Sequence, residues 1–204
     1  MTEHDAINVL KKLGFSDIAV KKLMKFHYYL IKWNSKYNLI SKNSEKDIWG
    51  RHIVDSAQLV GFINPLKANT IADLGSGAGF PGLILAIFFQ DSKFHVKLVE
   101  KSPVKRAFLN DMIVKLDIKA DILDNVYEDE VSADIIVCRA FKKLDKIMKI
   151  SREILKKPHK IMILKGKDAQ AEINNLPMDK NYSYKLETSI TDKKSKIVIV
   201  EVIK

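Results

Sequence analysis

Four glycines within eight residues constrain this chain more than any other feature of its sequence. They stand at positions 75, 77, 79 and 82, in the segment 71–82 that reads IADLGSGAGFPG. Apolar residues typical of a buried strand precede them, and an apolar helical stretch follows Pro81. Glycine permits tight turns and close approach of a ligand to backbone amides, and proline is tolerated in the first helical turn. The segment therefore predicts a strand, a glycine loop and a helix N-terminus, with free N–H groups for a nucleotide-like ligand.

The composition is that of a soluble globular protein. The chain has 204 residues, of which 47% are hydrophobic and 29% charged, which suits one domain with a small extension. Its apolar runs are too short to span a bilayer, so no membrane association is expected. A single cysteine, Cys138, excludes an internal disulfide and fits a reducing cytoplasm. We expect a cytoplasmic monomer.

The net charge of +10 is unevenly distributed along the chain. Residues 142–167 hold ten Lys or Arg against two acidic residues, a field that suits nucleic acid. Because 31 of the 35 basic residues are lysines, charge alone leaves a generally lysine-rich composition as an alternative. The few arginines are more informative, because arginine supplies a planar fork of donors that lysine lacks. They are Arg51, Arg106, Arg139 and Arg152.

Residues 1–64 are predicted to form a helical extension. Helices are expected over 3–13, from the N-cap Ser16 onward, and over 47–60, with 42–46 as a polar connector. The second helix carries two stripes. One holds Val20, Leu23, Met24, His27, Leu30, Ile31 and Asn34, and the other holds Phe26, Tyr29, Trp33 and Tyr37 among lysines. The aromatic stripe could stack on RNA bases, but packing against the main domain is the preferred interpretation.

Residues 65–204 alternate between strand and helix patterns, which predicts a doubly wound α/β domain. Between the second and third strands, Ser102 and Pro103 are expected to begin a helix. A turn at 191–195 is too short for anything but an antiparallel pair, so a mostly parallel sheet should end in a hairpin. The seven expected strands are 70–74, 95–100, 120–123, 134–138, 160–164, 182–189 and 196–203.

Two classes of nucleotide-like ligand fit the glycine loop. Glu100 ends the second strand, 21 residues after Gly79, where a carboxylate can accept both hydroxyls of a ribose. The Gly-x-Gly-x-x-Gly spacing at 77–82 admits an NAD-dependent oxidoreductase. Against that stand Asp73 before the loop, the terminal hairpin and the lack of a second domain. The Asp-x-Gly-x-Gly-x-Gly arrangement resembles the first motif of class I S-adenosylmethionine-dependent methyltransferases, which is the preferred class.

Further segments resemble one methyltransferase family. They are Lys32-Trp33-Asn34, Tyr37-Asn38-Leu39, Arg51-His52, Asp55-Ser56, Gly79-Phe80-Pro81-Gly82, Arg139-Ala140-Phe141 and Leu164-Lys165-Gly166. From about residue 30 to the C-terminus, the chain resembles the bacterial small-subunit rRNA guanine-N7 methyltransferases called RsmG or GidB. The resemblance implies a Rossmann-like class I fold, S-adenosylmethionine as cofactor and methylation of a guanine in 16S rRNA of the small ribosomal subunit.

The resemblance also implies cofactor contacts. It assigns them to Gly75, Phe80, Val126, Tyr127 and Arg139, and the loop motif adds Asp73, Gly77, Gly79 and Glu100. The sequence departs from the family at Asn125-Val126-Tyr127, where Arg-Ala-Glu is frequent, so a basic contact is missing or supplied elsewhere. It departs again at Cys138, where serine is common.

Guanine N7 carries a free lone pair, so its methylation requires orientation of the reactants but no general base. None is evident, and the five histidines have no metal-ligand spacing. Arg139 and Lys165 end predicted strands at the ligand-binding edge, so they are candidates to orient the guanine and clamp a phosphate. Arg51, His52 and Asp55 lie on adjacent helical turns, where they brace the extension or touch RNA. The candidate RNA ligands are Lys36, Arg51, Lys142, Lys143, Lys146 and Lys165.

The residues also admit three alternative functions. Cys138 stands near where RNA cytosine-C5 methyltransferases carry a nucleophile, but arginine follows it instead of proline, which favours a small buried residue. The whole chain could also be a catalytically silent RNA-binding module, or the NAD-dependent oxidoreductase considered above.

Overall fold

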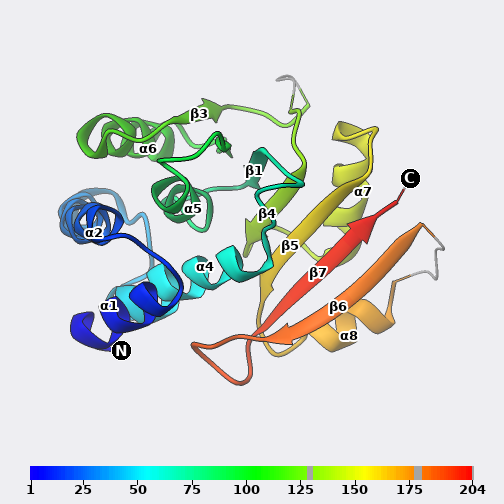
Figure 1. Ribbon diagram of the computed structural model, residues 1–204, viewed down its shortest axis with the longest axis horizontal. Helices are drawn as coiled ribbons and strands as arrows, with labels where there is room; N and C mark the ends of the chain where they lie inside the picture. Colours follow the sequence, from blue (N-terminus) through cyan, green and yellow to red (C-terminus); the bar gives the residue numbers. More distant parts are fainter. Residues whose placement is uncertain (128–130, 177–180, 204) are drawn as a thin grey trace.

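A computed structural model describes residues 1–127, 131–176 and 181–203. Its strands form one seven-stranded sheet in the order β3-β2-β1-β4-β5-β7-β6 (Figure 1). The pairings among β1 to β5 are parallel, whereas β7 is antiparallel to both β5 and β6. The predicted mostly parallel sheet with a terminal antiparallel hairpin is therefore confirmed. The strands are β1 Thr70–Leu74, β2 His95–Val99, β3 Ala120–Leu123, β4 Ile135–Arg139, β5 His159–Lys165, β6 Tyr182–Thr188 and β7 Lys196–Val202.

Side-chain caps begin several of the helices. Ser16 and Ser102 accept hydrogen bonds from backbone amides of the first turns of α2 and α6, as predicted. Thr2 caps α1 in the same way. The helical segments are α1 Glu3–Lys12, α2 Asp17–Tyr37, α3 Lys42–Glu45, η1 Trp49–Val54, α4 Asp55–Ala57, η2 Gln58–Phe62, α5 Gly82–Phe88, α6 Pro103–Leu116, α7 Leu144–Ile154 and α8 Ala169–Asn174.

The sheet separates two hydrophobic clusters. One face packs against α1, α2, α5, α6 and the segment 39–63, and the other packs against α7 and α8. Alternate residues of β4 show the division, because Val137 belongs to the first cluster and Ile136 and Cys138 to the second. The N-terminal 64 residues thus share one hydrophobic cluster with the first helices of the α/β part.

Three predictions for the N-terminal helices were wrong in detail. The helix expected over 47–60 is instead π-helical over Trp49–Val54, then a short α-helical turn, then 3₁₀-helical to Phe62. The expected connector 42–46 contains α3, whose N-cap is Ser41. Met24 and Ile31, expected on a buried face, are 41% and 39% exposed, because the buried face of α2 centres on Leu23, Phe26 and Leu30.

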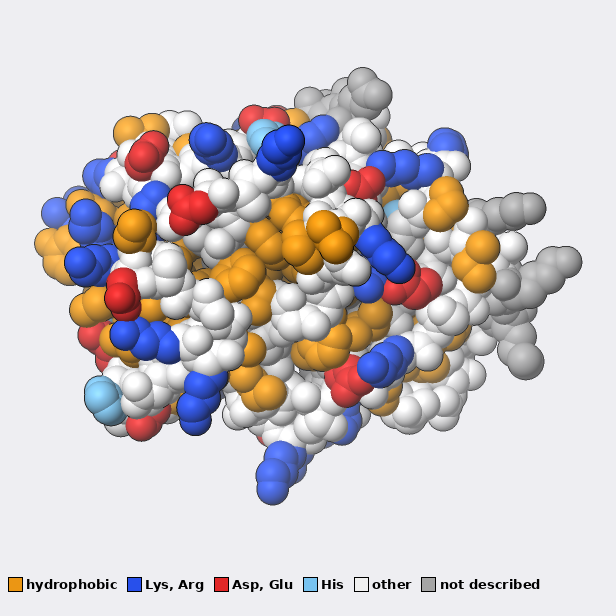
Figure 2. All heavy atoms as spheres, in the orientation of Figure 1, with side chains coloured by type: hydrophobic (Ala, Val, Ile, Leu, Met, Phe, Trp, Pro, Cys, Tyr) orange, Lys and Arg blue, Asp and Glu red, His pale blue; other side chains and the backbone are white. Residues whose placement is uncertain are grey.

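The aromatic stripe of α2 packs against the main domain, which was the preferred interpretation. Phe26 is fully buried against Phe80 and Phe108. Trp33 also contacts Phe108, and its Nε1 donates a hydrogen bond to Asp111 of α6 at 2.9 Å. Lysines and hydrophobic side chains remain on the outer face of α2, at the left rim in Figure 2.

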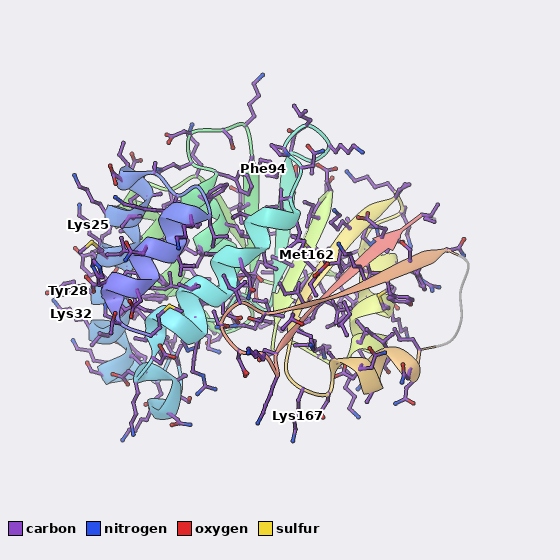
Figure 3. The ribbon with its side chains drawn as sticks, turned by 60° about the horizontal axis from the view of Figure 1, so that its bottom comes forward. Lys25, Tyr28, Lys32, Phe94, Met162 and Lys167 are labelled. Atoms are coloured by element: carbon purple, nitrogen blue, oxygen red, sulfur yellow. The ribbon has the colours of Figure 1, made fainter. Side chains whose placement is uncertain are left out.

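Figure 3 shows the two ends of the parallel strands. Phe94, just before β2, lies at the amino ends of the strands, and Lys167, just after β5, lies at their carboxyl ends, with Met162 between them. Lys25, Tyr28 and Lys32 project from α2 at a third side of the molecule. Among helices in the described ranges, none has the length and apolar character needed to cross a membrane.

Candidate functional site

The glycine loop follows β1 at the carboxyl edge of the sheet. The amides of Gly75 and Ser76 both donate to the carbonyl oxygen of Val99 in β2, at 2.9 and 3.0 Å. Gly75 has a φ of +77°, a conformation that residues with a Cβ rarely adopt. A Cβ at Gly75 would also lie 2.6 Å from Cδ2 of Phe141. Glycine is therefore required here both by the turn and by the aromatic ring beside it.

Glu100 joins this loop to α6. Its Oε2 accepts a hydrogen bond from the Gly77 amide, and its Oε1 accepts one from the Ser102 amide, each at 2.8 Å. Each carboxylate oxygen retains further lone-pair capacity for a ligand. Glu100 is 9% exposed, at the wall of a cavity. The acidic residue that the sequence assigns to a ribose thus lies against the loop.

This first cavity has a volume of about 390 Å³. Its walls are largely apolar, with the Glu100 carboxylate as the acidic group. That combination suits a nucleoside, whose base needs apolar walls and whose ribose hydroxyls need an acceptor. The lining residues are Gly75, Val99, Glu100, Lys101, Val126, Tyr127, Phe141, Lys142 and Ile150. Four predicted cofactor residues, Gly75, Glu100, Val126 and Tyr127, therefore lie together.

Five other predicted cofactor residues do not line this cavity, namely Asp73, Gly77, Gly79, Phe80 and Arg139. Asp73 is fully buried behind the loop, where its Oδ2 accepts a hydrogen bond from the Gly82 amide at 2.8 Å. Burial raises the pKa of Asp73 to about 7. Gly79 faces Leu83, and Phe80 is buried in the first hydrophobic cluster. By accepting this hydrogen bond, Asp73 stabilises the conformation of the glycine loop.

Arg139, at the end of β4, is tied to η1. Its guanidinium donates to the carbonyl oxygen of Arg51 at 2.8 Å and to Nδ1 of His52 at 2.6 Å. It also lies over the Phe80 ring, 4.9 Å from the centroid. Burial, together with the charges of Arg139 and Arg51, lowers the pKa of His52 to about 3. The imidazole is therefore neutral at physiological pH, and Nδ1 accepts the hydrogen bond.

A second cavity, of about 620 Å³, opens beside Arg139. It brings together three predicted residues, Arg51, Arg139 and Lys165, from η1, β4 and β5. Ala140 lines this cavity and the next residue, Phe141, lines the first, so the two cavities adjoin at the end of β4. The other lining residues are Ser44, Asp47, Gly50, His52, Asp55, Leu164, Gly166, Thr191, Asp192, Ser195 and Lys196.

Asp55 connects α4 to the β6–β7 turn, a contact that sequence reasoning missed. Its Oδ1 accepts hydrogen bonds from Gln58 Nε2 at 2.8 Å, Ser189 Oγ at 3.1 Å and Thr191 Oγ1 at 3.0 Å. Burial raises the pKa of Asp55, and Arg139 opposes that shift. Ser189 and Thr191 stand more than 130 residues away in sequence, and no local pattern indicates the pairing.

Lys165 lies at the cavity edge with its ammonium group already engaged. Its Nζ is 2.7 Å from Glu172 Oε2 and donates to the carbonyl oxygen of Lys142 at 3.0 Å. Lys142 itself is exposed, as are Lys143 and Lys146. These three lysines follow β4, and Lys142 also lines the first cavity.

Two remaining candidates lie apart from the cavities. Lys36 lines a separate groove with Trp33, Tyr37 and Asp111, so the structure does not bring it next to Arg139. Cys138 is fully buried, and burial raises the pKa of its thiol, which disfavours a thiolate nucleophile. Within 1–127, 131–176 and 181–203, no group of three His, Cys, Asp or Glu side chains is placed to hold a metal ion.

Comparisons with known proteins find relatives that share one name. The family model described as rRNA small subunit methyltransferase G matches residues 19–200. Ribosomal RNA small subunit methyltransferase G of Orientia tsutsugamushi is 37% identical over 200 residues, which cover 98% of each chain. The protein of the same name from Rickettsia bellii is 36% identical over 181 residues, which cover 88% of this chain and 92% of that one.

Solved structures share the fold at low sequence identity. An O-methyltransferase from Bacillus cereus in complex with SAH is 14% identical with a TM-score of 0.59, over 88% of this chain and 91% of that one. A precorrin-6y C5,15-methyltransferase from Geobacter metallireducens is 12% identical with a TM-score of 0.54, over 82% and 92% of the two chains. At these identities the likeness shows the fold alone, which is that of class I methyltransferases.

Proposed function

Because the chain belongs to the rRNA small subunit methyltransferase G family, we propose that it methylates N7 of one guanine in 16S rRNA. The methyl donor is S-adenosylmethionine. The two adjoining cavities at the carboxyl edge of one sheet carry the proposal, because a methyl transfer needs two ligands side by side. Neither the NAD-dependent oxidoreductase nor the silent RNA-binding module is supported by the family and its relatives.

The first cavity fits the cofactor by the chemistry of its walls. Glu100 offers carboxylate lone pairs to ribose hydroxyls, and Val126 and Tyr127 offer an apolar surface to the adenine. The amides of Gly75, Ser76 and Gly77 already donate hydrogen bonds within the protein, so the polar tail of the cofactor has to bind beside the loop and not to these N–H groups. When bound, S-adenosylmethionine supplies an electrophilic methyl group on a sulfonium. The residue at 125, asparagine instead of the arginine frequent in the family, adds no positive charge beside Val126.

The protein's task in this proposal is orientation. N7 carries its own lone pair, so no side chain has to remove a proton. His52, which lines the second cavity, already receives a hydrogen bond from Arg139 on Nδ1. We assign Arg139 the role of fixing η1, and hence the second cavity, against the end of β4. Lys165 positions Lys142 by donating a hydrogen bond to the Lys142 carbonyl oxygen. To bind a phosphate, Lys165 has to break its ion pair with Glu172.

The basic residues around the second cavity are the proposed RNA ligands. Arg51 lines the cavity itself. The exposed Lys142 lines the first cavity, and the exposed Lys143 and Lys146 follow it in the chain. Their charges suit contacts to phosphates on either side of the target nucleotide. Lys36, in the separate groove of α2, is proposed as a more remote phosphate contact.

Mapping of the methylated nucleotide tests the function. The protein is incubated with isotopically labelled S-adenosylmethionine and small ribosomal subunits or 16S rRNA that lack the modification. The expected result is one labelled 7-methylguanosine, which reverse transcription after borohydride and aniline cleavage locates. Label on another atom of guanine, label on cytosine, or no incorporation at all contradicts the proposal. The Arg139→Ala and Lys165→Ala variants belong in the same assay, because full activity in both removes their assigned roles.

A further inference from the structure

A methyltransferase that acts on N7 cannot identify guanine by N7. Adenine carries the same nitrogen, and a hydrogen bond to N7 occupies the lone pair that must attack the methyl group. Recognition therefore has to use another edge of the base. Guanine differs from adenine at position 2, where it carries an amino group that donates hydrogen bonds, and a carboxylate oxygen is a side-chain acceptor for it. The second cavity contains three carboxylates, of Asp47, Asp55 and Asp192.

Two of these carboxylates serve local structure. Both oxygens of Asp192 accept hydrogen bonds within the β6–β7 turn, from the Lys194 amide and Ser195 Oγ. Asp47 Oδ1 accepts from the Gly50 amide and pairs with the amino group of Met1. The side chain of Asp47 is 34% exposed, whereas that of Asp55 is 15% exposed. The environment of Asp47 is the more solvated of the two.

Asp55 differs, because its two oxygens have separate surroundings. Oδ1 accepts three hydrogen bonds, from Gln58, Ser189 and Thr191, which fix the orientation of the carboxylate. Among the described residues, Oδ2 accepts no hydrogen bond, and its charged neighbour is Arg139 Nη1 at 3.9 Å. Burial raises the pKa of Asp55, and the positive charge of Arg139 opposes that shift. One oxygen is thus anchored and the other is available to a ligand.

We propose that Asp55 Oδ2 accepts a hydrogen bond from the 2-amino group of the target guanine in the second cavity. This inference rests on the proposed function. Position 2 and N7 lie on opposite sides of a purine. The first cavity adjoins the second at Ala140 and Phe141, whereas Asp55 lies with Thr191 toward the hairpin turn. A base whose 2-amino group meets Asp55 therefore directs N7 toward the first cavity.

The test compares RNA substrates that differ only at the target base. Inosine keeps N7, O6 and N1–H but lacks the 2-amino group. The wild type should methylate the guanosine RNA with a kcat/KM roughly tenfold or more above that for the inosine RNA, because a site that accepts a hydrogen bond discriminates against an analogue without the donor. In Asp55→Asn this ratio should fall toward one, through loss of activity on guanosine.

Two control variants separate recognition from structure. Ser189→Ala removes one donor to Asp55 Oδ1 and leaves Oδ2 intact, so the guanosine-to-inosine ratio should persist. Asp47→Asn should also keep the ratio. If Asp55→Asn does not fold, a second comparison with the wild type tests the contact. RNA with 2,6-diaminopurine at the target carries the 2-amino group that adenine lacks, so it should react faster than RNA with adenine, by a similar factor.

The possible outcomes are distinct. Equal wild-type rates on guanosine and inosine RNA overturn the assignment, and so does a ratio that survives Asp55→Asn. A ratio lost in Asp47→Asn but kept in Asp55→Asn moves the contact to the other carboxylate and also overturns it. Failure of the proposed function itself looks different, because the wild type then methylates none of these RNAs.

Discussion

The guanidinium of Arg139 donates a hydrogen bond to Nδ1 of His52 over 2.6 Å, and so joins the end of β4 to η1. The His52 ring is also stacked on Phe80, 4.8 Å between centroids. Phe80 belongs to the glycine-loop segment, and it packs against Phe26 of α2. These contacts join the helical N-terminal part and the glycine-loop segment to the end of β4, beside the second cavity.

The burial of His52 beside Arg139 predicts that acid destabilises the folded protein. The pKa of His52 is lowered from 6.5 to about 3 in the folded protein, so the unfolded chain binds the extra proton more readily. The stabilisation is complete above pH 6.5 and is lost as the pH falls toward 3, by up to about 1.4 kcal/mol per pH unit. Urea unfolding at pH 5 and pH 7 measures this. In His52→Asn the free energy of unfolding should decline less between these pH values, and an unchanged decline contradicts the assignment.

The glycine loop offers a matched pair of substitutions. Gly75 and Gly77 both have positive φ, +77° and +58°, so alanine at either should cost about 1 kcal/mol in backbone strain. Only at Gly75 would the new Cβ collide with Phe141, whereas at Gly77 nothing but the Gly75 carbonyl oxygen comes within 4 Å, at 3.8 Å. Calorimetric titration with S-adenosylmethionine should therefore show a larger loss of affinity for Gly75→Ala than for Gly77→Ala. The reverse order would show that Phe141 does not border the cofactor.

Electrostatic contacts to RNA are tested by salt dependence. Replacing Lys142, Lys143 and Lys146 by glutamine should reduce the slope of log Kobs against log salt by about two, since each lost phosphate contact removes about 0.7. The control replaces three exposed lysines, Lys67, Lys93 and Lys119, which precede β1, β2 and β3 at the opposite edge of the sheet. That variant loses the same charge and should keep its slope. Equal effects in the two variants would mean that net charge, not position, governs binding.

Cys138 should be dispensable for chemistry. Its side chain is fully buried in the second hydrophobic cluster, with a raised thiol pKa. Cys138→Ala should keep methyl transfer and lose about 1 kcal/mol of stability from the small cavity it leaves. Thermal melting checks the fold of the variant. Loss of methyl transfer in a folded variant would instead support a cysteine nucleophile.

The parts of the fold and site that the sequence predicts are those governed by local rules. The glycine loop is readable because positive φ demands glycine, and Ser102 before Pro103 is readable because a helix needs a cap. The strands can be predicted because short apolar runs bounded by turn residues are typical of buried strands. Glu100 follows from its spacing after the loop.

Long-range side-chain contacts have no such signal. The pairing of Asp55 with Ser189, and that of Lys165 with Glu172, depends on how the hairpin and α8 pack, which local periodicity does not encode. The break of the helix expected over 47–60 into three forms has the same origin, because tertiary packing overrides local propensity there. Exposure of Met24 and Ile31 likewise reflects which stripe of α2 meets α6.

In the proposed function, the glycine loop and Glu100 hold the cofactor beside the Arg139 cavity. A crystal structure of the protein with S-adenosylhomocysteine would show whether they do. We predict the ribose hydroxyls within hydrogen-bond distance of the Glu100 carboxylate, the adenine between Val126 and Ile150, and the sulfur directed toward the second cavity. Density for the ligand at any other site, or a sulfur directed away from Arg139 and Asp55, would contradict the account.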